Sequence, residues 1–439
     1  MATATMQPTE SRSWRDMFHI TRMGIFSVVF ILLGAGLLLA AVPQLAPDAV
    51  TRLTIGTIPS GVEGTPPTDL ALAIPTVPYT TVVALLYIIV GVVGLFPNEN
   101  LNRAKFWALL VGGILIFPSI LILAAAGQST NATSMLSSSV RLATPIVLGA
   151  LAGLWCERSG VVNIAIEGMM LSGAAFGFLV FSLLGPVMQS AHAQALGIVG
   201  AILAGGLIAA LHAWLSITFR TDQIVSGTVI NILAIGLTSF MRREILLTAQ
   251  DAGRETIQVA AVPILKDIPI IGEVFFEGKP IFYMMFVLLI LTHVMLFYTR
   301  WGLRTRAVGE NPHAADTLGI NVNRMRWINV IIGGMIAGLA GAWLTLETTG
   351  TFDDNMTSGR GFIALAALIF GKYLPFGAFG GGLLFGFSSA LETRFQILGV
   401  TLPTQFLQMT PYVVTIIVLA GLVGRSRPPA ADGVPYVKE

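Results

Sequence analysis

Long runs of apolar residues recur along nearly the whole chain. A helix needs about 20 such residues to cross the hydrocarbon layer of a bilayer, which is about 30 Å thick. The pattern therefore predicts an all-α fold, a polytopic transmembrane helical bundle of about twelve spans. The predicted spans lie near residues 24–42, 79–96, 106–125, 136–155, 164–184, 194–218, 224–246, 280–299, 327–347, 361–374, 376–394 and 408–424.

The tenth run, 361–374, is the weakest of these predicted spans. It is short, it contains Lys372 and it runs into Pro375. A half-helix or a re-entrant segment is the alternative, because irregular backbone is tolerated at membrane depth where it is buried in protein. In that case the chain has eleven spans and its C-terminal arginines lie outside.

Composition supports a membrane protein and excludes several kinds of site. Charged residues make up 11% of the 439 residues, against about 25% in soluble proteins, and hydrophobic residues make up 54%. The net charge of +2 gives no argument for a nucleic-acid partner. The single cysteine, Cys156, and the five scattered histidines offer no disulfide and no metal-ligand spacing. We therefore expect no metal and no cofactor bound by this chain.

The distribution of lysine and arginine predicts that both termini are cytoplasmic. Cytoplasmic loops carry an excess of these residues, and twelve spans leave both ends on one side. Most of the 25 basic residues then fall inside. A basic segment precedes the first apolar run, so a cleaved signal peptide is the alternative to an uncleaved anchor. The run is long for a signal peptide, which favours the anchor.

The segment 300–326 is the most basic loop and is predicted to be cytoplasmic. Asn311 and Pro312 suit a helix start, so His313 to Leu318 can form a short helix that ends at Gly319. A short helix at the membrane face is well placed to bind a soluble partner. The alternative is an ordinary interfacial helix whose arginines bind lipid headgroups.

Several sequence blocks resemble a known family. The run Ala314-Ala315-x-x-x-Gly319-Ile320, preceded by Glu310, is similar to the coupling loop of ABC importer permeases. The core as a whole resembles the nucleoside and simple-sugar branch of that group, within the branched-chain amino acid/sugar permease superfamily. The blocks that carry this resemblance are TPIVLGALAGLWCERSGVVNIAIEGMMLSGA (144–174), DQIVSGTVINILAIGLTSF (222–240), RAVGENPHAADTLGI (306–320) and GRGFIALAALIFGKYLPFGAFGGGLLFG (359–386).

The resemblance implies a heteromeric importer in a bacterial plasma (inner) membrane. In that family, two permease chains form the path, ATPase subunits bind below, and an extracytoplasmic solute-binding protein delivers the solute. The residues expected to couple this chain to the ATPase are Gly309, Glu310, Asn311, Pro312, Ala314, Ala315 and Gly319. The resemblance covers residues 136–425. It leaves 1–135 as an extension with three predicted spans and 426–439 as a disordered cytoplasmic tail.

The chain carries no recognisable ATPase motif of its own. A phosphate-binding P-loop needs the pattern G-x-x-x-x-G-K-[ST]. The near match at Gly371-Lys372 is followed by Tyr373, and Ala366 stands where the first glycine belongs. We therefore predict a transport subunit, not an enzyme, with ATP used by the partner ATPase.

Polar groups inside spans are costly and are therefore candidates for the solute path. Asn231, with Ser226 and Thr228 nearby, can hydrogen-bond a neutral solute or, alternatively, a neighbouring helix. Glu167 suits a structural pair with an arginine, or else a gate or docking role. Glu347 closes the ninth span. In the loop before the tenth span, Asp353, Asp354 and Arg360 are candidate contacts for the binding protein, or simply solvated charges.

Two other classes of function compete with the importer. A secondary transporter driven by an ion gradient is expected to use carboxylates at mid-membrane. The sequence places no Asp or Glu convincingly there. A membrane enzyme needs a nucleophile–base or metal cluster, and no catalytic set can be assembled from so few polar residues. The importer is therefore the leading prediction, and the secondary transporter is the alternative.

Overall fold

The computed structural model describes residues 22–58, 68–95, 102–247, 255–399, 409 and 426–438. The chain divides into two compact units. One consists of Met1–Thr54 and Ala71–Thr130, and the other of Ile55–Leu70 and Asn131–Glu439.

Three apolar helices build the first unit, as the runs at 24–42, 79–96 and 106–125 predict. They are α2 (Arg22–Gly36), extended by the short helices η1 (Leu37–Ala41) and η2 (Val42–Gln44), then α3 (Thr76–Leu95) and α4 (Asn102–Ala124). The helices α2 and α3 pack closely, and the rings of Phe30 and Tyr87 lie 5.4 Å apart between their centroids.

A small sheet was not part of the all-α prediction. It consists of β1 (Val50–Ile58), β2 (Thr68–Pro75) and β3 (Ser129–Asn131), in the order β2-β1-β3. The sequence of β1, VTRLTIGTI, is rich in β-branched residues, which favour strands. The prediction of a purely helical fold is therefore wrong for this segment.

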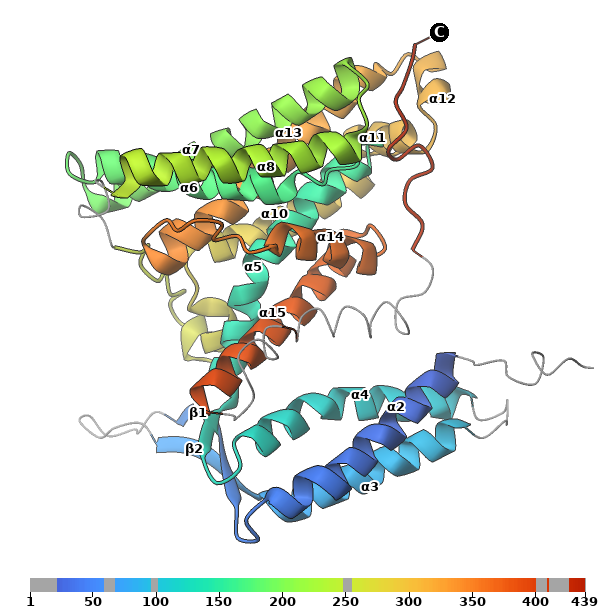
Figure 1. Ribbon diagram of the computed structural model, residues 1–439, viewed down its shortest axis with the longest axis vertical. Coiled ribbons are helices and arrows are strands. Elements are labelled where there is room, and N and C mark those ends of the chain that lie inside the picture. The colour runs from blue at the N-terminus through green and yellow to red at the C-terminus, as the bar shows by residue number, and fades with distance from the viewer. Residues whose placement is uncertain are drawn as a thin grey trace, which may run out of the picture. The chain divides into compact units, whose positions relative to one another are not determined.

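The second unit is a helical bundle, shown with its elements labelled in Figure 1. Its α-helices are α5 (Ala132–Glu157), α6 (Ile166–Leu184), α7 (Ser190–Ala213), α8 (Gln223–Met241), α10 (Pro280–Tyr298), α11 (Arg300–Glu310), α12 (Pro312–Thr317), α13 (Val322–Ala342), α14 (Arg360–Phe370) and α15 (Pro375–Ile397). Its shorter helical segments are η4 (Trp214–Thr218), η5 (Arg242–Leu246), η7 (Leu265–Asp267), η8 (Gly272–Phe276) and η9 (Trp343–Thr349).

The helix α5 forms the centre of this bundle. Every residue from Ala143 to Glu157 is buried, because α10, α13, α14 and α15 all pack against it. Close packing elsewhere depends on small residues. A Cβ atom on Gly173 of α6 would lie 2.5 Å from the carbonyl oxygen of Gly338 of α13, so the two backbones touch there.

Nine helices of the described residues are long and apolar enough to cross a membrane, so the count of about twelve spans is not confirmed. The predicted twelfth span, 408–424, lies almost wholly outside the described residues. The predicted tenth span is the 11-residue α14, which is about 16 Å long and can cross only half a bilayer. The glycine-rich α15 has the length to cross but is not among the nine.

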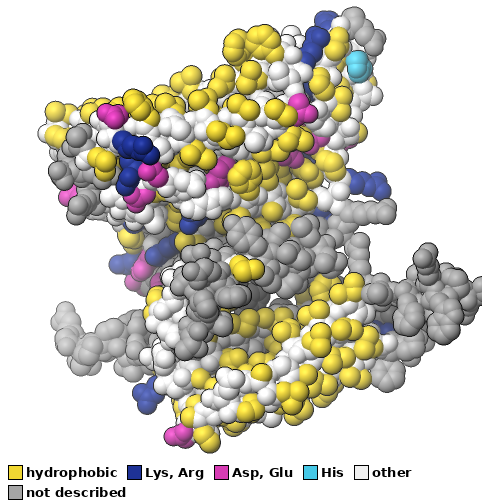
Figure 2. Space-filling model, viewed as in Figure 1, with side chains coloured by type: hydrophobic (Ala, Val, Ile, Leu, Met, Phe, Trp, Pro, Cys, Tyr) yellow, Lys and Arg dark blue, Asp and Glu magenta, His cyan; other side chains and the backbone are white. Residues whose placement is uncertain are grey.

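Apolar side chains cover much of the outer surface of the helices. Figure 2 shows hydrophobic side chains spread over the described parts of the visible face, with fewer charged side chains among them. On α8, one exposed stripe contains Ile224, Val225, Val229 and Ile232. Such a surface suits contact with lipid or with another membrane helix, since neither contact requires a solvated skin.

Candidate functional site

The predicted cytoplasmic segment 300–326 folds into two helices and the start of a third. The helix α12 spans Pro312–Thr317, which confirms the short helix expected there. Asn311 caps it, because its side-chain oxygen accepts a hydrogen bond from the Ala314 N–H at 3.0 Å. Gly319 ends it with a φ of +78°, a backbone conformation that favours glycine. Residues 300–310, expected to be loop, form the additional helix α11.

The residues of this segment divide into a buried and an exposed set. Pro312 and Ala315 form the buried side of α12. The exposed positions, which a docking partner can reach, are Glu310, Asn311, His313, Ala314, Thr317, Leu318 and Gly319.

The end of α11 lies directly on the end of α5. Gly309 is buried, and a Cβ atom there would lie 2.3 Å from the Arg158 carbonyl oxygen. The Arg158 side chain in turn donates two hydrogen bonds, of 3.0 and 2.6 Å, to the carbonyl oxygen of Tyr373 in the turn after α14. Burial lowers the pKa of Arg158. A continuous set of contacts therefore joins α11, the end of α5 and the half-helix α14.

The C-terminal tail packs against the same region, so the expectation of a disordered tail is wrong for residues 426–438. These residues contain no helix or strand, yet Tyr436 is only 5% exposed. Its ring joins an apolar cluster with Val308, Ala315, Val322 and Met325. The composition of the tail, rich in proline and small residues, does not predict this anchoring. The residues that bury Tyr436 lie far from it in the sequence.

The buried arginine of α13 also contacts the tail. Arg326 donates one hydrogen bond to the Ser159 carbonyl oxygen at 3.2 Å and another to the Val434 carbonyl oxygen at 2.9 Å. Asp432 lies nearby, and burial raises the pKa of its carboxyl although the Arg326 guanidinium favours the charged form.

Both polar atoms of the Asn231 side chain in α8 are hydrogen-bonded within the protein. Its oxygen accepts from the Gly168 N–H at 2.8 Å, and its nitrogen donates to the Ile164 carbonyl oxygen at 2.9 Å. These bonds tie α8 to the start of α6. The geometry favours the interhelical alternative over a free hydrogen-bond partner for solute.

Replacing Asn231 by alanine is expected to lower the thermal unfolding temperature in detergent. Each buried polar group left unpaired costs about 1–3 kcal/mol, and this substitution leaves two. Thr228→Ala on the same helix is the matched control, because that side chain is exposed and bonds only the Ile224 carbonyl oxygen of its own helix. Equal unfolding temperatures for the two variants would contradict the structural role of Asn231.

The two neighbours of Asn231 on α8 face different surroundings. Ser226 is buried and lies 3.2 Å from Nδ1 of His212 in α7. Thr228 lies on the exposed side of α8. The three polar residues of this predicted cluster therefore do not converge on one site.

Glu167 contacts backbone N–H groups at the start of α14 and not the arginine expected as its partner. Its two carboxylate oxygens accept from the N–H groups of Gly359 at 2.8 Å and Gly361 at 2.6 Å. A carboxylate at a helix N-terminus is also favoured by the helix dipole. Glu167 thus holds the N-terminus of α14 against α6.

A cavity of about 430 Å³ with several charged residues in its wall lies at the end of α5 opposite α12. Its volume is in the range of small-molecule sites, about 300–1,000 Å³. Glu347 contributes to its wall and accepts a hydrogen bond from the Ile281 N–H at 2.8 Å. Lys279 also lines the cavity; it donates to the Glu347 carbonyl oxygen and to Thr256 Oγ1, and burial lowers its pKa.

Sequence reasoning missed most of the charged residues of this cavity. Besides Lys279 they are Arg141 from α5, Glu277, and Arg394 from α15. Arg141 carried a usable signal, because a charge inside an apolar run is costly and marks a candidate site. The other residues come together only through the tertiary fold.

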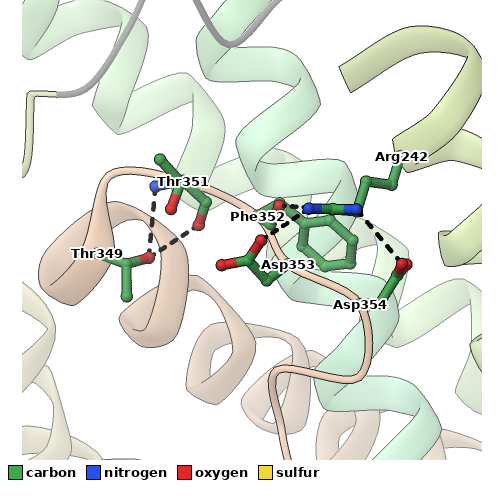
Figure 3. Close-up of polar contacts among 6 residues, drawn as sticks. All are labelled: Arg242, Thr349, Thr351, Phe352, Asp353 and Asp354. Atoms are coloured by element: carbon green, nitrogen blue, oxygen red, sulfur yellow. Dashed lines mark hydrogen bonds and ion pairs between the residues drawn. The ribbon is translucent and has the colours of Figure 1, made fainter. Parts of the chain in front are cut away.

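Two of the three candidate contacts for a binding protein, Asp353 and Asp354, form an ion-pair cluster with Arg242, drawn in Figure 3. Arg242 pairs with Asp353 at 2.9 Å and with Asp354 at 3.4 Å, and thus joins the end of α8 to the loop before α14. Arg360 donates instead to the carbonyl oxygens of Met356 and Thr357. Because Asp353 is 66% exposed, the pair contributes little to stability and stays accessible.

Comparison with known proteins identifies relatives for the second unit. Residues 135–419 match the family model described as the branched-chain amino acid transport system permease component. The guanosine ABC transporter permease protein NupQ of Bacillus subtilis is 43% identical over 302 residues, which are 67% of this chain and 94% of that protein. The nucleoside ABC transporter permease protein NupC of Lactococcus lactis is 43% identical over 298 residues, with the same shares.

A more distant relative is the putative glucose ABC transporter permease protein TsgC13 of Haloferax volcanii. It is 33% identical over 313 residues, which are 67% of this chain and 93% of that protein. No solved structure matches the chain.

Proposed function

Because this chain belongs to the family of branched-chain amino acid transport system permease components, we propose that it is the membrane permease subunit of an ATP-driven importer of nucleosides or related simple sugars. The observation that carries the solute class is the 43% identity to permeases named for guanosine and for nucleosides. The relative named for glucose keeps simple sugars within the proposed class.

The proposed motor is a pair of separate ATPase subunits. The near match to a P-loop, Gly371-Lys372, lies in the turn between α14 and α15, and Lys372 and Tyr373 have positive φ values of 54° and 56° there. A P-loop instead precedes a helix whose N-terminus holds phosphate. The exposed positions of α11 and α12, from Glu310 to Gly319, support docking of such a subunit on the cytoplasmic side.

These contacts support a transport cycle for the proposed importer. Binding of ATP to the partner moves α12, and the contact of Gly309 with Arg158 carries that movement to α5 and to α14. The spans then alternate between outward-open and inward-open states, biased by the different affinity of ATP for the two. Both termini are cytoplasmic in this scheme, which puts the ion pair of Arg242 on the outside.

Solute enters from an extracytoplasmic binding protein in this proposal. Asp353, Asp354 and Arg360 are the proposed contacts for that protein. Of the path candidates, Thr228 and Glu347 remain the stronger, since Thr228 is exposed and Glu347 lines the cavity at the start of α5. A second permease chain completes the path and is proposed to cover part of the apolar stripe on α8.

The test is uptake of labelled guanosine by cells that hold the complete importer, with unlabelled nucleosides, pentoses and hexoses as competitors. We expect nucleosides to compete, and we expect uptake to stop when the ATP supply is depleted. Uptake abolished by ionophores but indifferent to ATP supply would instead establish the ion-gradient alternative, for which the comparisons give no support. Competition by sugars alone would overturn the nucleoside assignment.

A further inference from the structure

The C-terminal residues 428–438, called the strap below, lie over α11, α12 and α13. Two backbone N–H groups of the strap bond the end of α11. The Ala431 N–H donates to the Gly309 carbonyl oxygen at 2.9 Å, and the Ala430 N–H donates to a Glu310 carboxylate oxygen at 3.2 Å. Two residues of the predicted coupling set are therefore held by the strap.

Side chains anchor the rest of the strap. The Tyr436 ring is buried among residues of α11, α12 and α13, and it meets the His313 ring edge-on at 5.3 Å between centroids. Arg326 of α13 bonds the Val434 carbonyl oxygen, and Lys438 lies 3.8 Å from Asp316 of α12. The strap thus contacts α11, α12 and α13 at once.

The strap contains no helix or strand to order it. Fixing the backbone of one residue costs about 1–2 kcal/mol, so a segment without secondary structure stays in place only through such anchors. The anchors contact α11, α12 and α13. Of these, α12 has only six residues and is too short to be stable alone.

We propose that the strap is a positioning element for ATPase coupling, which fixes α12 to α13 and to the end of α5 so that these parts move together. This inference rests on the proposed function. Tyr436 is the principal anchor, and Arg326 positions the strap from beneath.

An inhibitory lid would cover the whole surface proposed for ATPase docking, whereas the strap contacts only Glu310 and His313 of it. Leu318 at the end of α12 is 80% exposed, and Asn311 and Ala314 are exposed as well. The strap lies at the side of α12 and leaves these residues open, which is the geometry of a scaffold.

The experiment uses the full importer and two changes to this chain. One variant ends at Arg427, and the other carries Tyr436→Ala; Tyr436→Phe and Val437→Ala are the matched controls, because the first keeps the ring and the second alters an exposed neighbour. Membrane level, copurification of the ATPase and ATP-driven uptake are measured for each. We expect both test variants to lose copurification and uptake by about threefold to thirtyfold, Tyr436→Phe to keep more of both than Tyr436→Ala, and Val437→Ala to match the unaltered chain.

A cleavable strap separates folding from function. A specific protease site inserted after Arg427 of the otherwise unaltered chain allows the strap to be cut in an importer that has already assembled, and a wash then removes the released peptide. Uptake that falls after cleavage supports the proposal, and uptake that stays constant or rises overturns it. A rise would identify the strap as an inhibitor.

Ala314→Trp distinguishes failure of the strap from failure of the proposed coupling. This substitution places a bulky ring on the exposed surface of α12 and does not touch the anchors of the strap. If Ala314→Trp lowers ATPase copurification while strap removal changes nothing, only the strap inference fails. If Ala314→Trp leaves copurification unchanged, the proposed coupling role of α12 fails first.

Discussion

Gly309→Ala is expected to abolish ATPase copurification and uptake. The added Cβ atom would lie 2.3 Å from the Arg158 carbonyl oxygen. The Cβ atom is fixed to the backbone of α11 and the oxygen belongs to the backbone after α5, so neither can move aside cheaply. The helix α11 must then shift off the end of α5, which also breaks the hydrogen bond from Ala431. Overpacking of this kind costs about 1–3 kcal/mol, and here the displaced helix leads directly into α12, the proposed docking element for the ATPase.

Gly319→Ala is the matched control for this prediction. Gly319 belongs to the same segment, but nothing lies within 4 Å of a Cβ atom there, and the substitution meets only the strain of its φ of +78°. A left-handed conformation costs a non-glycine residue about 1–2 kcal/mol, confined here to the end of α12. We expect Gly319→Ala to keep part of the uptake when it is normalised to membrane level. If Gly309→Ala retains as much uptake as Gly319→Ala, close contact between α11 and α5 is not needed for coupling.

Glu167→Ala is expected to have the second large effect, because it frees the start of α14. The N–H groups of Gly359 and Gly361 both donate to this carboxylate. Each donor left unpaired in a buried place costs about 1–3 kcal/mol. Without these hydrogen bonds at its N-terminus, α14 is expected to lose its fixed position on α6. We expect both uptake and the unfolding temperature to fall.

Glu167→Gln sharpens the test, because it keeps the size of the side chain and replaces one acceptor by an NH₂ donor. We expect it to lose about half as much stability as the alanine variant, since one of the two bonds survives. Asp353→Asn is the control, because it weakens an exposed ion pair worth at most about 1 kcal/mol. Thermal unfolding in detergent measures all three. If Glu167→Ala and Asp353→Asn have equal unfolding temperatures, Glu167 does not stabilise the position of α14.

The sequence predicted the features that depend on local pattern. Apolar runs located the helices of both units, and the spacing of Asn311, Pro312 and Gly319 predicted α12, because caps act within one turn. The resemblance over 136–425 is confirmed by the family match over 135–419. A short tenth run containing Lys372 also indicated a half-helix, and α14 is one.

The features that failed depend on contacts between distant residues. Glu167 was expected to pair with an arginine, but its partners lie 192 and 194 residues away in the backbone. The tail reads as disordered because nothing in its own composition forms a helix or strand, and Tyr436 is buried only by the cluster beneath it. Arg394 likewise reaches the cavity at the start of α5 through the packing of α15 on α5.

The most direct test of the account is transport by proteoliposomes that hold this chain, its partner permease and the ATPase, with the binding protein outside. We predict that labelled guanosine accumulates only when ATP is enclosed and the ATPase can hydrolyse it, and that Gly309→Ala stops the accumulation. Accumulation driven by an imposed ion gradient in the absence of ATP would contradict the account.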